Sequence, residues 1–399
     1  MKNGWELKTL GDLFDITSSK RVFESDWKRE GVPFYRAREI VKLAQHGFVD
    51  NELFISEEMF SRYSAKFGIP AEGDIMVTGV GTLGICYVVQ KHDRFYFKDG
   101  NIIWLKKKSE ADSRFVEYAF KSDFLRKQID DSVGATVGTY TIVKAKNTQI
   151  PVPPLTEQQR IIGILDEAFE RIATAKANAE HNFQNARALF QSHLQSVFTQ
   201  RGPAWKEKTL KEIATTFGRG KSKHRPRNAP HLYGGKYPFV QTGDIRNADH
   251  NITEYSQTYS EAGLAQSRLW PKGTICITIA ANIAETGILG FDACFPDSII
   301  GVVASSKQAD IGFIEYLLQT FKARLQAMGK GSAQANINMG TFENERFPFP
   351  SVVEQKQIVA KLDDLREETQ RLASLYERKL AALEALKKSL LHQAFTGQL

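Results

Sequence analysis

A glycine-rich segment is the feature of this chain that comes nearest to a cofactor site. Residues 79–84 read Gly-Val-Gly-Thr-Leu-Gly and follow the apolar run 74–78, which is the pattern of a dinucleotide-binding turn. Such a turn must open a helix whose N-terminus holds the pyrophosphate. Residues 85–89, Ile-Cys-Tyr-Val-Val, predict a strand instead, and the related stretch 279–287 keeps only its last glycine. We therefore predict a turn between two strands and no bound nucleotide cofactor.

The sequence also lacks the common motifs of catalysis and metal binding. Its eight histidines are dispersed, and Cys86, Cys276 and Cys294 are too scattered for a disulfide framework or a zinc knuckle. It contains neither a G-x-S-x-G nucleophile turn nor a G-x-x-x-x-G-K-[ST] phosphate loop. We predict no catalytic, metal-binding or cofactor-binding residue in this chain.

One polar segment concentrates positive charge. Arg219, Lys221, Lys223, Arg225 and Arg227 lie within nine residues, and neighbouring glycines and a proline disfavour a helix there. The formal net charge of +7 agrees with a polyanionic partner without proving one. An irregular basic loop of this kind can follow a phosphate backbone, so we predict contact with nucleic acid. The alternative is a solvated charged loop.

Further candidates lie at related places in the two halves of the chain. Arg36 and Arg38 follow Pro-Phe-Tyr, and Gln241 and Arg246 follow Pro-Phe; Arg and Gln can bind guanine and adenine edges bidentately. Polar glycine segments recur at 134–139 and 331–336. The DNA-binding candidates are Lys20, Arg21, Arg36, Arg38, Thr136, Thr139, Arg219, Lys221, Lys223, Arg225, Arg227, Gln241, Arg246, Lys330, Gln334 and Asn336.

These candidates are distributed over an internal repeat. Trp5, with Lys-Thr-Leu at 8–10, returns as Trp205 with Lys-Thr-Leu at 208–210, and Pro-Val-Pro at 151–153 returns as Pro-Phe-Pro at 348–350. The period of about 200 residues indicates a duplicated domain and not a solenoid. Two similar domains on one chain favour a protein that grips two places on one target.

Each copy begins with a β-rich part, residues 1–150 and 203–347. Short apolar runs such as 74–78, 85–89, 275–278 and 299–303 lie between glycine-containing turns and predict strands. We expect helices at 115–128 and at the corresponding 313–328. The expected fold class is α+β, with two tandem β-rich domains of mixed α/β structure.

Each copy ends in a stretch that predicts a long helix. Residues 156–199 and 352–396 contain no proline, and Thr156 with Gln159 and Ser351 with Glu354 fit capping boxes. An apolar stripe at alternating three- and four-residue steps predicts a seam against another helix. Its members are Leu165, Phe169, Ile172, Ala179, Phe183, Ala186, Phe190 and Val197 in the first helix, and Ile358, Leu362, Leu365, Leu372, Leu383, Leu386 and Leu390 in the second. We predict that the two helices pair; the alternative is that each lies on its own domain.

No apolar run approaches the roughly 18–20 residues that span a bilayer. The N-terminal residues, Met-Lys-Asn-Gly-Trp, lack the apolar core of a signal peptide. We therefore expect a cytoplasmic protein without a membrane partner.

The whole chain resembles the DNA-specificity subunits of type I restriction-modification systems. The resemblance lies mainly in residues 151–162, Pro-Val-Pro-Pro-Leu-Thr-Glu-Gln-Gln-Arg-Ile-Ile, and in their counterpart 348–359. Residues 73–75 and 81–84, and the helix ends at 198–200 and 395–397, also match. The second copy departs from the pattern at 279–287. The resemblance implies an antiparallel helix pair with pseudo-two-fold symmetry that separates two target recognition domains.

In function, the resemblance implies a non-catalytic subunit that reads a bipartite, asymmetric site in double-stranded DNA, one half per domain. The implied partners are two methyltransferase (modification) subunits and restriction (motor) subunits. S-adenosylmethionine, ATP and Mg would belong to these partners, and no cofactor to this chain. The predicted domains are residues 1–153 and 201–350, with spacer helices at 154–200 and 351–399. The alternatives are a coiled-coil interaction scaffold and an enzyme that binds a nucleotide at 79–84.

Overall fold

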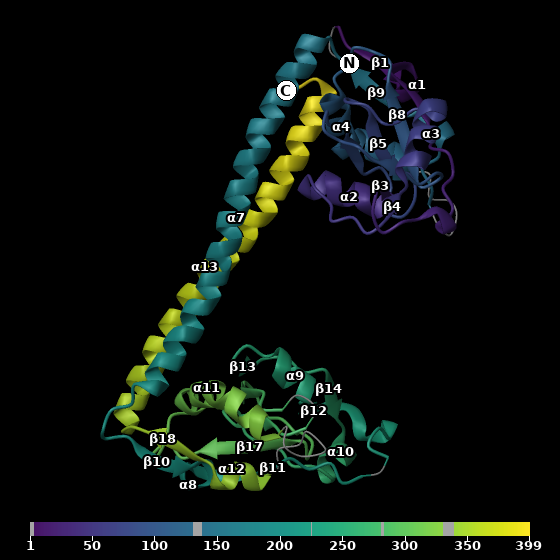
Figure 1. Ribbon diagram of the computed structural model, residues 1–399. Helices are drawn as coiled ribbons and strands as arrows, with labels where there is room; N and C mark the ends of the chain where they lie inside the picture. Colours follow the sequence, from purple (N-terminus) through teal and green to yellow (C-terminus); the bar gives the residue numbers. More distant parts are fainter. Residues whose placement is uncertain (1–3, 131–137, 225, 281–282, 330–338) are drawn as a thin grey trace. The chain divides into compact units, whose positions relative to one another are not determined.

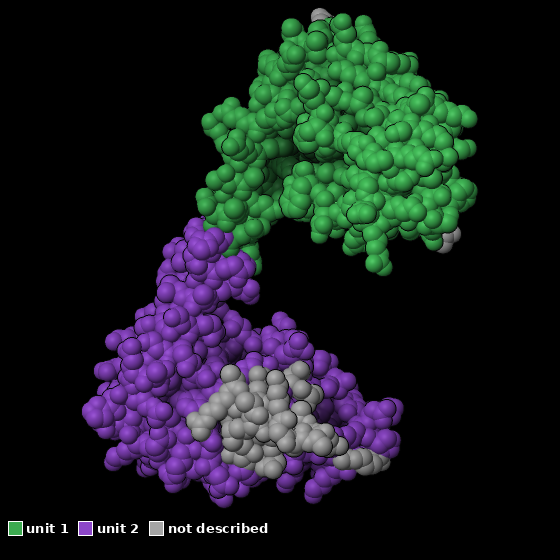
Figure 2. Space-filling model, viewed as in Figure 1, with its two compact units in different colours: residues 1–180, 377–399 green, residues 181–376 purple. Residues whose placement is uncertain are grey.

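A computed structural model of the chain describes residues 4–130, 138–224, 226–280, 283–329 and 339–399. Its contacts divide the chain into two compact units, which Figure 2 distinguishes by colour. Unit 1 contains residues 1–180 and 377–399, and unit 2 contains residues 181–376. Each unit therefore takes part of both long helices.

Unit 1 consists of a β-rich domain and two helical segments (Figure 1). Its strands are β1 (Glu6–Thr9), β2 (Phe14–Thr17), β3 (Val32–Tyr35), β4 (Phe54–Ile55), β5 (Ile75–Thr78), β6 (Cys86–Val88), β7 (Tyr96–Phe97), β8 (Ile102–Lys107) and β9 (Gln149–Val152). Its shorter helices are α1 (Leu10–Leu13), η1 (Glu24–Asp26), α2 (Ala37–His46), α3 (Glu57–Phe67), α4 (Ser113–Lys121), α5 (Asp123–Asp130) and α6 (Ile142–Asn147).

Three small sheets organise unit 1. The central one has four strands in the order β2-β8-β5-β6, a second has the order β4-β3-β7, and β1 pairs with β9. The β1–β9 ladder is antiparallel, with Glu6 opposite Val152, and so joins the start of the domain to the residues just before the long helix. Helices α4 and α5 cover one face of the central sheet and share its apolar core.

Unit 2 repeats this plan with differences. Its strands are β10 (Lys206–Thr209), β11 (Ala214–Arg219), β12 (Tyr233–Phe239), β13 (Asn251–Ile252), β14 (Gln257–Tyr259), β15 (Ile275–Thr278), β16 (Thr286–Leu289), β17 (Ile299–Ala304) and β18 (Arg346–Phe349). Its shorter helices are α8 (Leu210–Ile213), η2 (Pro230–Leu232), α9 (Thr242–Asn247), α10 (Glu261–Ala265), α11 (Ile311–Gly329) and α12 (Met339–Asn344). The sheets are β11-β17-β15-β16-β13, β12-β14 and β10-β18.

The glycine motif at 79–84 is a turn between strands, as predicted. β5 pairs antiparallel with β6, with Ile75 opposite Val88, and no helix follows Gly84. The Thr78 hydroxyl accepts a hydrogen bond from the Ile85 amide at 3.0 Å, which closes the turn. Gly84 has φ +69°, and in the second unit Ala284 takes the equivalent left-handed conformation with φ 60°. The helix that a dinucleotide-binding turn requires after its last glycine is therefore not formed here.

The long helices are α7 (Leu155–Thr199) and α13 (Val352–Thr396). Within unit 1 they pack side by side and antiparallel, and Lys176 binds Glu384 across the seam at 2.7 Å. The C-terminal end of α13 completes the core of unit 1, where Phe395 lies against Phe115 with 5.0 Å between ring centroids. The C-terminal end of α7 contributes Phe198 to the core of unit 2 in the same way.

Four local predictions for the helices need correction. Expected helix 115–128 is broken at Ser122, whose extended backbone ends α4 before α5 begins. α7 begins at Leu155, so Thr156 lies inside the helix, and the Pro154 carbonyl accepts the Glu157 and Gln158 amides at 2.9 and 3.0 Å.

Ser351 accepts the Glu354 amide as predicted, but the Glu354 carboxylate binds the Trp205 indole at 3.0 Å instead of returning to Ser351. Leu386, assigned to the seam, is 47% exposed. Among the residues that the structure describes, no helix is both long and apolar enough to cross a bilayer.

Candidate nucleic-acid interface

The basic loop of unit 2 is held closely against the sheet that precedes it. β11 ends at Arg219, and the amides of Gly220 and Lys221 donate to the carbonyls of Ile299 and Phe295 at 2.9 and 3.1 Å. A side chain at Gly220 would place its Cβ only 2.2 Å from the Phe295 carbonyl oxygen, so only glycine fits. Backbone contacts therefore fix the start of this loop while its charged side chains stay outside.

The charges of this loop are not equivalent. Arg227 binds the Asp297 carboxylate through two contacts, at 2.8 and 3.0 Å, and Arg219 donates to the Asp297 backbone carbonyl at 2.7 Å. The side chains of Lys221 and Lys223 are exposed, and within the described residues neither ammonium forms an ion pair. Arg219 and the two lysines thus present uncompensated charge, whereas Arg227 is largely neutralised.

The candidates for base contact lie on two equivalent helices, three of them at a helix start and Arg246 in the last turn of α9. Gln241 is the N-cap of α9, and its backbone amide donates to the Asp244 carboxylate at 2.8 Å. Arg36 is the N-cap of α2, and its backbone amide donates to the Glu39 carboxylate at 2.9 Å. The Gln241 side chain donates to Gln257 at 2.8 Å. Arg246 is exposed in α9.

Arg36 and Arg38 share one buried carboxylate. Both donate to Glu39, and Arg38 also binds Glu52 at 2.6 Å. Burial raises the pKa of Glu39, but the hydrogen bonds from the two arginines outweigh burial and leave that pKa below its usual value. The carboxylate is therefore ionised at neutral pH and compensates part of the arginine charge.

Lys20 and Arg21 lie beside aromatic and acidic groups of unit 1. Arg21 binds Asp99 at 3.0 Å, and the Lys20 ammonium lies 6.0 Å from the centre of the Phe67 ring. Lys66 lies 5.6 Å from the same ring, and Phe67 is 37% exposed. Sequence analysis did not select Lys66 and Phe67. Their adjacency at the end of α3 was visible, but their closeness to Lys20 depends on the fold.

Five of the sixteen predicted site residues lie outside the described residues: Thr136, Arg225, Lys330, Gln334 and Asn336. Thr139 is exposed, and its carbonyl accepts a hydrogen bond from the Lys144 ammonium at 3.3 Å. The remaining candidates are spread over the segment after β2, the start of α2, the basic loop, and the start and last turn of α9.

A buried glutamine fixes the start of each long helix to its domain. The Gln158 side chain donates to the Pro153 carbonyl at 2.8 Å and accepts the Asp112 amide at 2.9 Å. Gln355 makes the equivalent contacts with Pro350 and Asp310, at 2.9 and 2.8 Å. These contacts give a structural reason for the repeated Pro-x-Pro and Glu-Gln residues.

A buried tyrosine makes a second, equivalent contact between domain and helix. The Tyr118 hydroxyl donates to Asp166 at 2.5 Å, and the Tyr316 hydroxyl donates to Asp363 at 2.6 Å. Burial, followed by the hydrogen bond to the carboxylate, raises the pKa of both tyrosines well above the usual value. The hydroxyls therefore stay protonated donors, and each helix is attached to its domain at two places.

The fold defines a duplicated protein: two β-rich units of the same plan each contain segments of the same two long helices. The sequence profile of the type I restriction modification DNA specificity domain matches this chain twice, at residues 2–180 and 203–377. The chain belongs to this family. The scaffold and cofactor-enzyme alternatives are not favoured.

Individual relatives agree with this assignment. A putative MjaX specificity subunit of Methanocaldococcus jannaschii is 20% identical, with 99% of this chain and 93% of that protein aligned. A putative type I specificity subunit of Haemophilus influenzae is 29% identical, but the alignment covers only 42% of this chain and 40% of that protein. The EcoBI specificity subunit of Escherichia coli is 20% identical over 100% of this chain and 86% of its own length.

Solved structures show the same fold. A chain from a structural study of complex assembly and conformational transition of the type I R-M system has a TM-score of 0.77 at 20% identity, covering 100% of this chain and 99% of that one. The HsdS subunit of Thermoanaerobacter tengcongensis has a TM-score of 0.68 at 20% identity, covering 100% and 98%.

Proposed function

We propose that this chain is the non-catalytic subunit that gives a type I restriction-modification complex its DNA sequence specificity. Each unit reads one half of a bipartite, asymmetric site in double-stranded DNA. The observation that carries the proposal is the double family match, one in each compact unit. The units carry different residues at the candidate base-contact positions, Arg36 and Arg38 on α2 and Gln241 and Arg246 on α9, which supports two different half-sites.

In this proposal the basic loop supplies affinity, and residues on α2 and α9 supply sequence discrimination. Arg219, Lys221 and Lys223 present charge on a backbone that is fixed by the sheet, which suits contacts with phosphates. Gln241 and Arg246 lie on α9, where amide and guanidinium groups can reach base edges. Arg36 and Arg38 would have the corresponding role in unit 1.

The two long helices act as spacer and partner surface. α7 and α13 each run through both units without interruption, so their length limits how far apart the two half-sites lie. Several apolar side chains on them are exposed, including Leu189, Leu375 and Leu386 at 47–52%. Such residues suit contact with protein. Two modification subunits would bind there, with restriction subunits in the full complex.

The chemistry belongs to these partners. The modification subunits would use S-adenosylmethionine to methylate adenine N6, and the motor subunits would use ATP and Mg. The absence of a recognised catalytic or phosphate-binding motif in the sequence supports this division.

Modification-sensitive long-read sequencing of genomic DNA, with and without this gene, tests the proposal. We expect deletion to remove one split N6-methyladenine motif, which would also reveal both half-sites and the spacer. If the methylome is unchanged, the purified chain with its modification subunits should still bind a split DNA site. Failure in both assays would refute the proposed function.

A further inference from the structure

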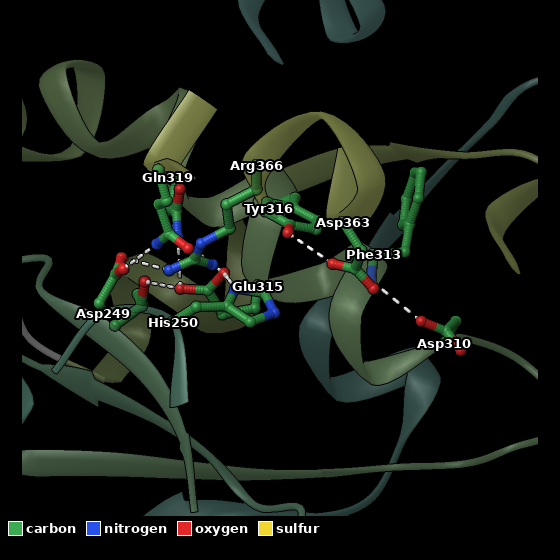
Figure 3. Close-up of polar contacts among 11 residues, drawn as sticks. Asp249, His250, Asp310, Phe313, Glu315, Tyr316, Gln319, Asp363 and Arg366 are labelled. Carbon is green, nitrogen blue, oxygen red and sulfur yellow. Dashed lines mark hydrogen bonds and ion pairs between the residues drawn. The ribbon is translucent and has the colours of Figure 1, made fainter. Parts of the chain in front are cut away.

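A single buried carboxylate on α11 forms hydrogen bonds with two separate segments of unit 2. The Glu315 side chain is completely buried and accepts hydrogen bonds from His250 Nδ1 at 2.5 Å, Thr286 Oγ1 at 3.1 Å and Gln319 Nε2 at 2.8 Å (Figure 3). A buried carboxylate is costly unless donors surround it, and here three side chains supply them. His250 lies in the loop between α9 and β13, and Thr286 is the first residue of β16, just after the turn that contains Ala284.

Each of these two segments includes or adjoins a residue with positive φ, a conformation that L-residues seldom adopt. Among the described residues, His250 and Ala284 are the non-glycine residues with positive φ, at 71° and 60°. His250 binds Glu315 directly, and Ala284 lies two residues before Thr286. Such conformations persist where neighbouring contacts determine them, and they often mark functional segments. Glu315 therefore contacts one residue with positive φ, His250, and the strand residue Thr286, which lies two residues after the other.

The loop that contains His250 is also attached to α13. Asp249 binds Arg366 and Gln370 of that helix. The His250 ring stacks on Tyr316 with 4.5 Å between centroids, and the Tyr316 hydroxyl binds Asp363 at 2.6 Å (Figure 3). α9, which carries Arg246, ends at Asn247, only two residues before Asp249. The polar network thus begins two residues after the end of a candidate base-reading helix.

The first unit shows that the fold does not require this network. Glu117 occupies the position of Glu315, just before the equivalent tyrosine, Tyr118. Its carboxylate is 23% exposed and binds Lys121, one turn further along its own helix, at 2.6 Å. The contacts from Glu315 to the loops are therefore a feature that the second unit has added to a common framework.

We propose that Glu315 is a positioning residue for recognition of the second half-site. It fixes residues 248–252 and 283–287 on α11, and through the first of these segments it sets the position of Arg246 and Gln241 on α9. Glu315 itself does not touch DNA. This inference rests on the proposed function.

The test compares Glu315→Gln with its matched control, Glu117→Gln, in the full chain purified with its modification subunits. Affinity is measured for duplexes with both half-sites intact, with the first altered and with the second altered. Glutamine keeps the size of the side chain but lacks the charge and one acceptor oxygen. We expect E315Q to reduce discrimination at the second half-site about tenfold, equivalent to about 1.4 kcal/mol, and to leave the first unchanged. E117Q should change neither ratio.

A second variant covers the case in which E315Q does not fold. Glycine adopts positive φ without strain and has no side chain that could contact Glu315, so His250→Gly should reproduce the loss at the second half-site. Because each ratio compares two DNAs on the same preparation, partial unfolding would lower both affinities and leave the ratio unchanged. Unchanged discrimination in a folded variant, or equal loss at both half-sites, would overturn the inference. A wild-type complex that discriminates at neither half-site would overturn the proposed function instead.

Discussion

The unequal charges of the basic loop lead to a prediction with a defined sign and size. Each phosphate that a protein neutralises contributes about 0.9 to the slope of log affinity against log salt concentration. Lys221 and Lys223 are exposed and uncompensated, so replacing both with alanine should flatten the slope by up to about 1.8. Between 50 and 200 mM salt, the variant would then lose about twelvefold less affinity than the wild type.

Asp297 allows the opposite change in the same loop. Its carboxylate neutralises Arg227, so Asp297→Asn should release that guanidinium for a phosphate and steepen the slope by up to about 0.9. The backbone carbonyl that binds Arg219 is retained in this variant. Arg227→Ala should change the slope less than loss of either lysine, because Arg227 is already neutralised by Asp297 and contributes no phosphate contact.

Fluorescence anisotropy with a labelled duplex, titrated across a salt series, measures both slopes. Lys307→Ala is a suitable control, because it removes a lysine from the far end of the β11–β17 ladder. Lys307 follows the end where Ala304 pairs with Ala214, and the basic loop begins at the other end, where Arg219 pairs with Ile300. An unchanged slope in the double lysine variant would refute the phosphate contacts. A flatter slope in the Asp297 variant would refute the assignment of Arg227 as a neutralised cation.

The other predictions concern the helices and the division of labour between the units. Gln355→Ala removes the partners of the Asp310 amide and the Pro350 carbonyl, and should lower the free energy of unfolding of unit 2 by about 2–4 kcal/mol in urea denaturation. The control Gln357→Ala, at an exposed position, should change it by less than about 0.5 kcal/mol. Equal effects of the two variants would contradict the anchoring role of Gln355. Inserting four residues after Ala186, with a matching turn in α13, adds about 6 Å to the helices and should lengthen the unread spacer of the methylated motif by one or two base pairs. A changed half-site with an unchanged spacer would argue against the helices as a ruler. Exchanging residues 1–150 with those of another family member should alter one half of the motif, and alteration of both halves would show that the units do not read independently.

The elements with strong sequence periodicity were predictable, and the local exceptions have physical causes. The proline pairs and the proline-free stretches after them placed both long helices within two residues of their observed starts. Leu386 fits the spacing but lies outside the seam. Thr156 fits a capping box, yet the Pro154 carbonyl accepts the first helical amides. The direction in which the chain enters the helix at Pro154 therefore determines which group caps the helix, and a short sequence motif does not encode that direction.

The candidate site was predictable in composition but not in charge. Arg219 to Arg227 form one basic run in the sequence, whereas the fold brings Asp297 from 70 residues away to neutralise one end of it. Glu315 gave no sequence signal as a positioning residue. Its role depends on its burial and on partners from two segments distant in the sequence. Neither can be inferred from the sequence of the helix, which resembles its counterpart in the first copy.

The division of the chain into units has a consequence for biosynthesis. Unit 2 is continuous from 181 to 376, but the core of unit 1 needs Leu391, Ala394 and Phe395 from α13. While a ribosome makes the chain, unit 1 therefore waits with an unfinished apolar surface until unit 2 has emerged. Nascent chains stalled before residue 377 should bind chaperones through the first unit, even though that unit was translated first.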